Sequence, residues 1–250
     1  MAVSFAAELQ KARRRHDLLL CLLVPCILVL WVGGLSKGSP EELANGYSEL
    51  LYSVPVIHAI MLPVLMSVLA SRLWDMENRG NMQKLLYTLQ SRRSLFVGKV
   101  LFGGLEIFLV TFVEMAALIL LGNLHGYTES FPGGQFLYLA VCTLAVNLML
   151  FFSAFLIVLF AGNSLPALCV GIVGALLGLF SAFLPPIVSY FVPWGYFIPL
   201  GAYEVADWEE GTHTVTYGVR GCNWGLLAFT VVVSGLLLYI CWRSVQRQEV

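Results

Sequence analysis

Few side chains in this chain could carry out chemistry, and the most unusual are two carboxylates inside an apolar segment. Glu106 and Glu114 both fall in the apolar run between Leu95 and Gly122. On a helix, residues eight apart differ by about 80° in azimuth and about 12 Å in height, so both side chains can face the protein interior. A carboxylate at bilayer depth costs roughly 2.5–3.5 kcal/mol on insertion scales, so it needs a partner or a function.

Two interpretations of these glutamates remain open. Either they line a polar route or gate for a cationic substrate, or each is protonated and hydrogen-bonds a neighbouring helix, for instance where two membrane subunits meet. The second interpretation is favoured for Glu106, which lies nearer the predicted inner surface. His58 also lies in an apolar run and has no second ligand near it in the sequence. We interpret it as a packed or pore-facing histidine rather than a metal ligand.

The sequence carries no motif for nucleotide hydrolysis or for other catalysis. A Lys-Gly-Ser occurs at residues 37–39, but without the glycine spacing of a phosphate-binding loop. Hydrolase signatures are absent, and the six cysteines lack metal-ligand spacing. We therefore expect no enzyme activity, no catalytic residue, no cofactor site and no metal site on this chain. Any ATP-driven process would use ATP and magnesium on another polypeptide.

The other notable stretch is a polar interruption, residues 72–99, between two apolar runs. It holds six of the chain's 14 basic residues: Arg72, Arg79, Lys84, Arg92, Arg93 and Lys99. One helical stripe, at i, i+3, i+4 and i+7, is formed by Met82, Leu85, Leu86 and Leu89. Gly80 is the predicted hinge between the preceding span and this helix. A helix of this size cannot bury its stripe alone, so it must lie on the membrane, on other spans or on a partner.

The composition predicts an integral membrane protein in which helices position these residues. Hydrophobic residues make up 59% of the chain and charged residues 12%, and the mean hydropathy is +0.83. Each of six apolar runs has about the 20 residues that a bilayer crossing needs. The predicted spans are residues 18–35, 51–73, 95–122, 135–160, 165–191 and 223–242. Residues 3–16 are predicted to form a basic helix on the membrane surface.

The basic residues also predict the orientation of the spans. With the N-terminus inside, the inner segments hold 12 Lys and Arg residues and the outer segments hold only Lys37 and Arg220. This bias places both termini in the cytoplasm. The outer segments are acidic, most densely at Glu204–Glu210. We expect this stretch to be a solvated loop that could attract cationic peptides.

An irregular element is predicted before the last span. The segment from Pro185 to Gly201 has four prolines among many aromatic residues. Proline breaks helices, and irregular backbone at membrane depth needs cover from protein or water. The segment is predicted to be a half-crossing element, an aromatic belt at the outer interface, or both. In the span before it, Gly174 and Gly178 allow close helix packing.

The polar interruption resembles the coupling-helix region of type-2 ABC exporter permeases. In that family an acidic, glycine-containing segment is followed by a Leu-Leu pair, a Ser-Arg element and a lysine that opens the third span. The matching residues here are Glu77, Gly80, Leu85-Leu86, Ser91-Arg92 and Lys99. Many members have proline before the Ser-Arg element, where this chain has Gln90. The resemblance covers the whole chain, with about 250 residues, six spans and both ends inside.

Within that family, the chain is most similar to the permeases of lantibiotic-immunity and antimicrobial-peptide-resistance transporters. The Pro193-Trp194-Gly-Tyr196 segment adds to this likeness. The resemblance implies an all-α polytopic membrane protein with a single permease domain, 1–250, a coupling helix at about 78–90 and a re-entrant element before the last helix. It assigns ATPase coupling to Glu77, Gly80, Met82, Leu85, Leu86, Leu89 and Arg92. It places Pro193 and Trp194 at a pathway or gate. Glu106 and Glu114 are candidates for the same pathway or gate because of their position inside the third span.

The resemblance also implies partners. These are a dimer of ATP-binding subunits that carries ATP and magnesium, a second and related permease in a heterodimer, the lipid bilayer and a cationic amphipathic peptide, but no nucleic acid. The expected location is a bacterial cell membrane. An exporter for a lipid, a drug or a polysaccharide is the alternative within transport, and a non-transporting scaffold or sensor subunit is the alternative outside it.

Overall fold

The fold is known from a computed structural model that describes residues 8–12, 16–35, 43–78, 91–209 and 214–247. Within these ranges, six helices are long and apolar enough to cross a membrane. They are α2 (Asp17–Leu35), α4 (Gly46–Asn78), α6 (Arg92–His125), α7 (Gly133–Ala161), α8 (Leu165–Phe180) and α10 (Trp224–Arg247). The predicted all-α polytopic membrane fold is therefore confirmed. The predicted coupling helix lies outside the described residues, apart from Asn78 at the end of α4.

Local sequence signals account for several helix ends. Ser91 is the N-cap of α6, and its hydroxyl accepts a hydrogen bond from the backbone N–H of Ser94 at 3.3 Å. Gly126 ends α6 with a φ of 69°, and Gly162 ends α7 with a φ of 61°. Glycine adopts this left-handed backbone without steric cost, so it stops each helix sharply.

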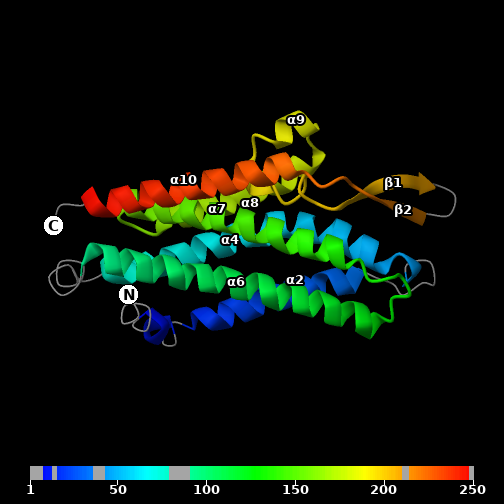
Figure 1. The fold of residues 1–250 in the computed structure, drawn as a ribbon, viewed down its shortest axis with the longest axis horizontal. Coiled ribbons are helices and arrows are strands. Elements are labelled where there is room, and N and C mark those ends of the chain that lie inside the picture. The colour runs from blue at the N-terminus through cyan, green and yellow to red at the C-terminus, as the bar shows by residue number, and fades with distance from the viewer. Residues whose placement is uncertain (1–7, 13–15, 36–42, 79–90, 210–213, 248–250) are drawn as a thin grey trace.

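The central helix of the bundle is α4. It packs against α7 and α8 on one side and against α2 and α6 on the other. In its apolar window 67% of the residues are buried, against 22% for α10, which packs mainly on α7. Figure 1 shows the helices running side by side along the long axis of the molecule.

The two ends of the bundle differ in charge and structure. At one end α4 and α10 terminate and α2 and α6 begin (Figure 1). We call it the basic end, because it carries Arg72, Arg92, Arg93, Lys99, Arg243 and Arg247. The opposite end, which we call the hairpin end, carries the antiparallel strands β1 (Tyr203–Glu209) and β2 (Thr214–Val219).

The hairpin corrects the expectation of a solvated loop at Glu204–Glu210. The strand β2 is rich in β-branched and aromatic residues, which favour an extended chain, and it pairs with β1 along its whole length. Tyr217 packs against Tyr52 of α4 with a ring separation of 5.4 Å. This contact holds the hairpin on the bundle.

The fifth span is shorter than predicted. Its helix, α8, ends at Phe180 instead of continuing to residue 191, and a 3₁₀ turn, η1 (Ser181–Phe183), follows. Leu184 is extended, with ψ 151°, because a residue before proline avoids the helical region. Two short helical elements come next, α9 (Pro186–Ser189) and η2 (Pro193–Gly195). We call residues 181–201 the fold-back segment.

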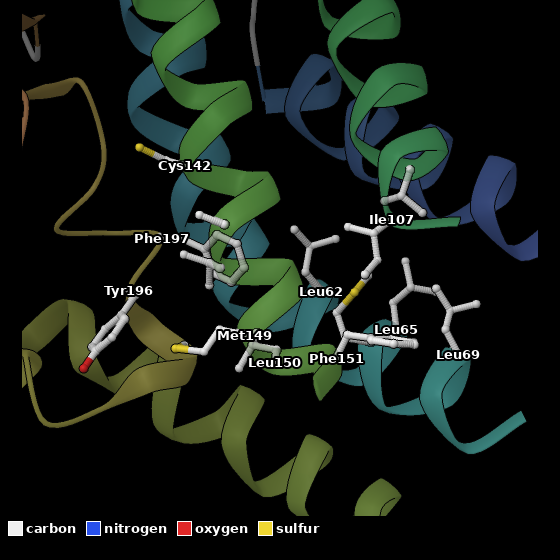
Figure 2. Packing of buried hydrophobic residues seen from close by; sticks show 14 of the residues in the cluster. Leu62, Leu65, Leu69, Ile107, Cys142, Met149, Leu150, Phe151, Tyr196 and Phe197 are labelled. Carbon is white, nitrogen blue, oxygen red and sulfur yellow. The ribbon is translucent and has the colours of Figure 1, made fainter. Parts of the chain in front are cut away.

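The core between α4, α6 and α7 depends on one glycine. Figure 2 shows Phe151 of α7 close to Leu65 of α4 and Ile107 of α6. Phe151 is 1% exposed, and Gly103 of α6 makes room for its ring. A Cβ at position 103 would lie 2.4 Å from Cζ of Phe151, whereas a Cβ at the adjacent Gly104 would have nothing within 4 Å.

We expect Gly103→Ala to destabilise the bundle and Gly104→Ala to leave it unchanged or stabilise it. Overpacking a core costs about 1–3 kcal/mol, which exceeds the gain of about 1 kcal/mol in helix propensity that both alanines bring. Thermal unfolding of the purified protein in detergent measures the difference, with Gly104→Ala as the matched control. Equal melting temperatures for the two variants would contradict this packing.

Candidate functional site

The most distinctive internal feature is a buried hydrogen bond between two helices. Nε2 of His58 in α4 and Oε1 of Glu114 in α6 form this bond, and both side chains are 0% exposed. His58 is 12 residues from the start of α4 and Glu114 is 11 residues from the end of α6. The pair thus lies about 17 Å along the helix axes from the hairpin end.

This pair gives His58 a buried partner that the sequence did not indicate. The two residues are 56 positions apart in the chain, so their contact depends on α4 and α6 packing side by side. Glu114 therefore bonds within its own chain, to a neighbouring helix. Burial of both glutamates, which the helix geometry predicted, is confirmed, since Glu106 is 1% exposed. Glu106 lies about 12 Å further along α6, toward the basic end.

The fold-back segment supplies a third member of this site. The ring of Phe197 packs edge-on against the His58 ring, with centroids 5.4 Å apart and an interplanar angle of 70°. Phe197 is itself 3% exposed. One contact thus joins the irregular segment before α10 to the polar pair between α4 and α6, and we call His58, Glu114 and Phe197 the buried triad.

Two glycines seat the fold-back segment on α8. A Cβ at Gly174 would lie 2.3 Å from Nε1 of Trp194, and a Cβ at Gly178 would lie 3.0 Å from the carbonyl oxygens of Ala59 and Trp194. These glycines therefore serve packing within the chain. Gly174 is six residues before the end of α8, so Trp194 reaches back about 9 Å along that helix. Pro193, which starts η2, sets this turn.

The chemistry available to the buried triad is hydrogen bonding and proton sharing. Nδ1 of His58 and Oε2 of Glu114 are buried and have no hydrogen-bond partner in the part of the chain that the structure describes. Buried polar atoms are nearly always paired, so this surplus marks a place where partners can change. Among the described residues, no three His, Cys, Asp or Glu side chains come together as metal ligands would.

A second cluster of charged residues lies inside the basic end. Nζ of Lys99 in α6 donates a hydrogen bond to the carbonyl oxygen of Leu73 at 2.5 Å and lies 3.7 Å from Oε1 of Glu8. It also lies 5.4 Å from the ring centroid of Trp74, and its side chain is 1% exposed. Lys99 therefore ties the start of α6 to the last turns of α4.

The described part of the N-terminal segment packs on the bundle. In the described residues 8–12, Glu8 is 4% exposed and Ala12 is 0% exposed, whereas Leu9 is 43% exposed. These residues therefore pack on the bundle as well as facing outward. The ion pair with Lys99 holds Glu8 close to α6, and the surface helix at residues 3–16 stays a prediction.

Most of the predicted coupling residues fall outside the described ranges. This holds for Gly80, Met82, Leu85, Leu86 and Leu89, while the backbone of Glu77 belongs to the last turn of α4. Arg92 is described, and its Nη1 donates to the carbonyl oxygen of Gln246 at 3.0 Å. This bond joins the first residue of α6 to the last turn of α10. In the chain, the start of α6 follows closely after residues 79–90.

Sequence reasoning missed Phe197 and the pairing of His58 with Glu114. A signal was present, because both polar residues lie at similar depths in spans that run side by side. Combining depth with helix adjacency would have found the pair. Phe197 carried no signal of its own among the many aromatic residues of its segment.

We expect the buried pair to stabilise the fold in a coupled manner. His58→Phe or Glu114→Met leaves the other polar group buried without its partner, which costs roughly 1–3 kcal/mol for each variant. The double variant removes both groups and should lose less than the sum of the two single losses. A double-mutant cycle of thermal unfolding in detergent measures this coupling. Strict additivity would contradict the contact.

Comparison with known proteins agrees with this architecture. Residues 4–201 match the family described as ABC-2 family transporter protein. The matched range runs from the N-terminal helix through α8 and the fold-back segment, and it leaves out the hairpin and α10. A search of curated proteins finds no match. Because the match covers most of the chain and the bundle has six apolar helices, this protein belongs to the ABC-2 family and is a membrane permease of an ABC transporter.

Proposed function

We propose that this permease expels cationic amphipathic antimicrobial peptides, as in lantibiotic immunity or resistance. The observation that carries this proposal is the pairing of acidic and apolar surface at the hairpin end. Glu204 and Asp207 are exposed on β1, and the Glu204 side chain is 58% exposed. In the adjoining fold-back segment, Phe183 and Phe191 are each 81% exposed and Ile187 is 76% exposed.

This pairing fits a peptide that is both cationic and amphipathic. Residues 204–210 contain four carboxylates, and the basic residue of the hairpin region is Arg220, which lies 3.7 Å from Glu204. Acidic surface raises the local concentration of a cationic ligand, and exposed apolar side chains hold its nonpolar face. In the proposed orientation, the hairpin end faces outward from a bacterial cell membrane and both termini lie in the cytoplasm.

In this proposal the fold-back segment is the outer gate. Trp194 packs on Gly174 of α8 and Phe197 packs on His58 of α4, so movement of α4 relative to α8 would disturb these contacts. His58 contacts the inner side of this segment through Phe197, and Glu114 bonds to His58. A second, related permease completes the pathway as a heterodimer.

The energy in this proposal comes from two ATP-binding subunits on separate chains, which carry ATP and magnesium. The predicted helix at residues 78–90 docks on them through its apolar stripe. Two hydrogen bonds in the described structure hold the helix ends on either side of it, Lys99 to Leu73 and Arg92 to Gln246. These bonds support the proposal because they connect both borders of the docking helix to the bundle.

We expect Leu85→Asp/Leu86→Asp to detach the ATP-binding subunits while the permease stays folded. A charge in the centre of an apolar docking stripe opposes burial at the interface. Copurification of the partner subunits measures the loss, and the size-exclusion profile and thermal unfolding of the permease serve as the folding control. Normal copurification of the double variant would show that the coupling helix lies elsewhere.

Reconstitution in nanodiscs tests the cargo. With the ATP-binding subunits and the second permease present, we expect a cationic lantibiotic-type peptide to stimulate ATP hydrolysis, and lipids, drugs and polysaccharides to have no such effect. Stimulation by one of those compounds instead would identify the alternative cargo. Hydrolysis that no cargo stimulates in a fully assembled complex would favour the scaffold or sensor function.

The hairpin charges give a sharper prediction in the same assay. Glu204→Gln/Asp207→Asn should raise the peptide concentration for half-maximal stimulation about three- to tenfold, because two exposed charges that attract the peptide are lost. Arg220→Gln is the opposite-sign control and should lower that concentration or leave it unchanged. A loss of apparent affinity in all these variants, or in none, would exclude the acidic hairpin as the peptide-attracting surface.

A further inference from the structure

We propose that a pocket at the basic end, between α7 and α10, binds the phosphate headgroup of an anionic phospholipid. The pocket has a volume of about 550 Å³. Its polar side consists of Arg243, Ser244 and Arg247, and its apolar side includes Phe160 and Ile240, with Tyr239 beside them. We call it the arginine pocket, and its occupant is independent of which cargo the transporter moves.

The charge of the arginine pocket selects an anion. Arg243 and Arg247 are one helical turn apart, so they project from the same face of α10. Both guanidinium groups stay charged at any physiological pH. The lining contains no carboxylate, and in the described ranges no acidic side chain pairs with either arginine. Among the described residues, the charge at this pocket is therefore positive.

One arginine is held in position for a ligand. Nε of Arg243 donates to the Tyr239 hydroxyl at 2.9 Å, and its guanidinium carbon lies 5.5 Å from the centroid of the same ring. An arginine has five N–H groups, so this contact leaves four for a bound phosphate. Guanidinium binds phosphate oxygens through two parallel hydrogen bonds, which gives geometric selectivity as well as energy.

The apolar side of the pocket and its depth select a lipid among anions. Phe160 is 73% exposed, Tyr239 is 53% exposed and Ile240 is 42% exposed, all near the last turns of membrane-spanning helices. Tyrosine and arginine at the ends of spans lie at headgroup level, where basic pockets between helices bind anionic headgroups. A phosphate on the arginines would leave its acyl chains along Phe160 and Ile240.

A lipid bound here would strengthen a weak part of the bundle. α10 is the least buried span, with 22% of its window inside the protein, and it contacts mainly α7. The pocket joins these two helices at their shared end. The backbone carbonyl of Gln246, which lies between Arg243 and Arg247 in the chain, accepts the hydrogen bond from Arg92 at the start of α6. The lipid would thus also fix the helix end that borders residues 79–90.

The test compares lipids on purified, delipidated permease in detergent. We expect phosphatidylglycerol to raise the melting temperature with a saturable dependence on concentration, and phosphatidylcholine and soluble glycerol phosphate to leave it unchanged. Arg243→Gln/Arg247→Gln should weaken the apparent affinity for phosphatidylglycerol about thirtyfold. Arg93→Gln, an exposed arginine at the same end but outside the pocket, is the matched control and should bind normally.

Two further variants keep the outcome decisive. Arg243→Lys/Arg247→Lys retains the positive charge but not the paired hydrogen bonds of guanidinium, so it should bind phosphatidylglycerol with intermediate affinity. Full affinity of this variant would show that general surface charge, and not the guanidinium geometry, attracts the lipid. Phe160→Ala removes apolar wall alone and should weaken binding if the glutamine variant proves unstable. Unchanged phosphatidylglycerol binding by the glutamine variant would overturn the proposal, as would an equal loss in Arg93→Gln. Loss of ATP-binding subunits with unchanged lipid binding would reassign the pocket to a protein contact.

Discussion

The cost of placing polar side chains in hydrocarbon organises the interior of this permease. Within the spans, hydroxyl groups such as those of Thr111 and Thr230 bond to a carbonyl of their own helix, and several other polar groups bond to a neighbouring helix. His58 and Glu114 join α4 to α6, and Lys99 joins α6 to the end of α4. The Ser234 hydroxyl donates to the Ala145 carbonyl oxygen at 3.4 Å and joins α10 to α7. Each such bond fixes the register of two helices, which apolar packing alone specifies only weakly.

The same constraint shapes the fold-back segment. Its prolines remove backbone donors and stop α8, so the chain must satisfy its remaining polar groups locally and under protein cover. Short-range backbone bonds do this along the segment, and the Tyr196 hydroxyl donates to the carbonyl oxygen of Tyr190 at 2.8 Å. Cover comes from the close approach to Gly174 and Gly178 of α8. An irregular element can therefore lie beside a spanning helix, with one aromatic side chain against the buried pair.

Features that depend on one segment of the chain could be predicted from the sequence, whereas features that depend on contacts between distant segments could not. Hydrophobic runs predicted six spans, because crossing a bilayer is a property of each segment alone. Pro185 and Pro186 indicated that the fifth span ends early. The predicted span nevertheless continued to residue 191, because the residues after these prolines are also apolar. The hairpin was missed because its carboxylates outweighed the strand-forming residues of β2.

Tertiary contacts needed the structure. The His58–Glu114 pair spans 56 positions, so it depends on which helices are neighbours. Similarly, Lys99 was identified through a family motif, but its bond to Leu73 depends on how α6 packs on α4. The apolar stripe from Met82 to Leu89 stays a prediction, since it lies outside the described residues.

The positions of these contacts suggest how ATP-driven movement at the basic end could reach the hairpin end in the proposed transport cycle. Lys99 and Arg92 attach the start of α6 to α4 and α10, so displacement of the docking helix would move helix ends and not a free loop. About 22 Å further along α4 and α6, the hydrogen bond between His58 and Glu114 joins the same two helices. Among the described residues, Nδ1 of His58 and Oε2 of Glu114 have no hydrogen-bond partner. Sliding of α4 against α6 would therefore exchange hydrogen bonds and shift the surface on which Phe197 rests. A gate placed there responds to helix movement without needing any contact of its own with the ATP-binding subunits.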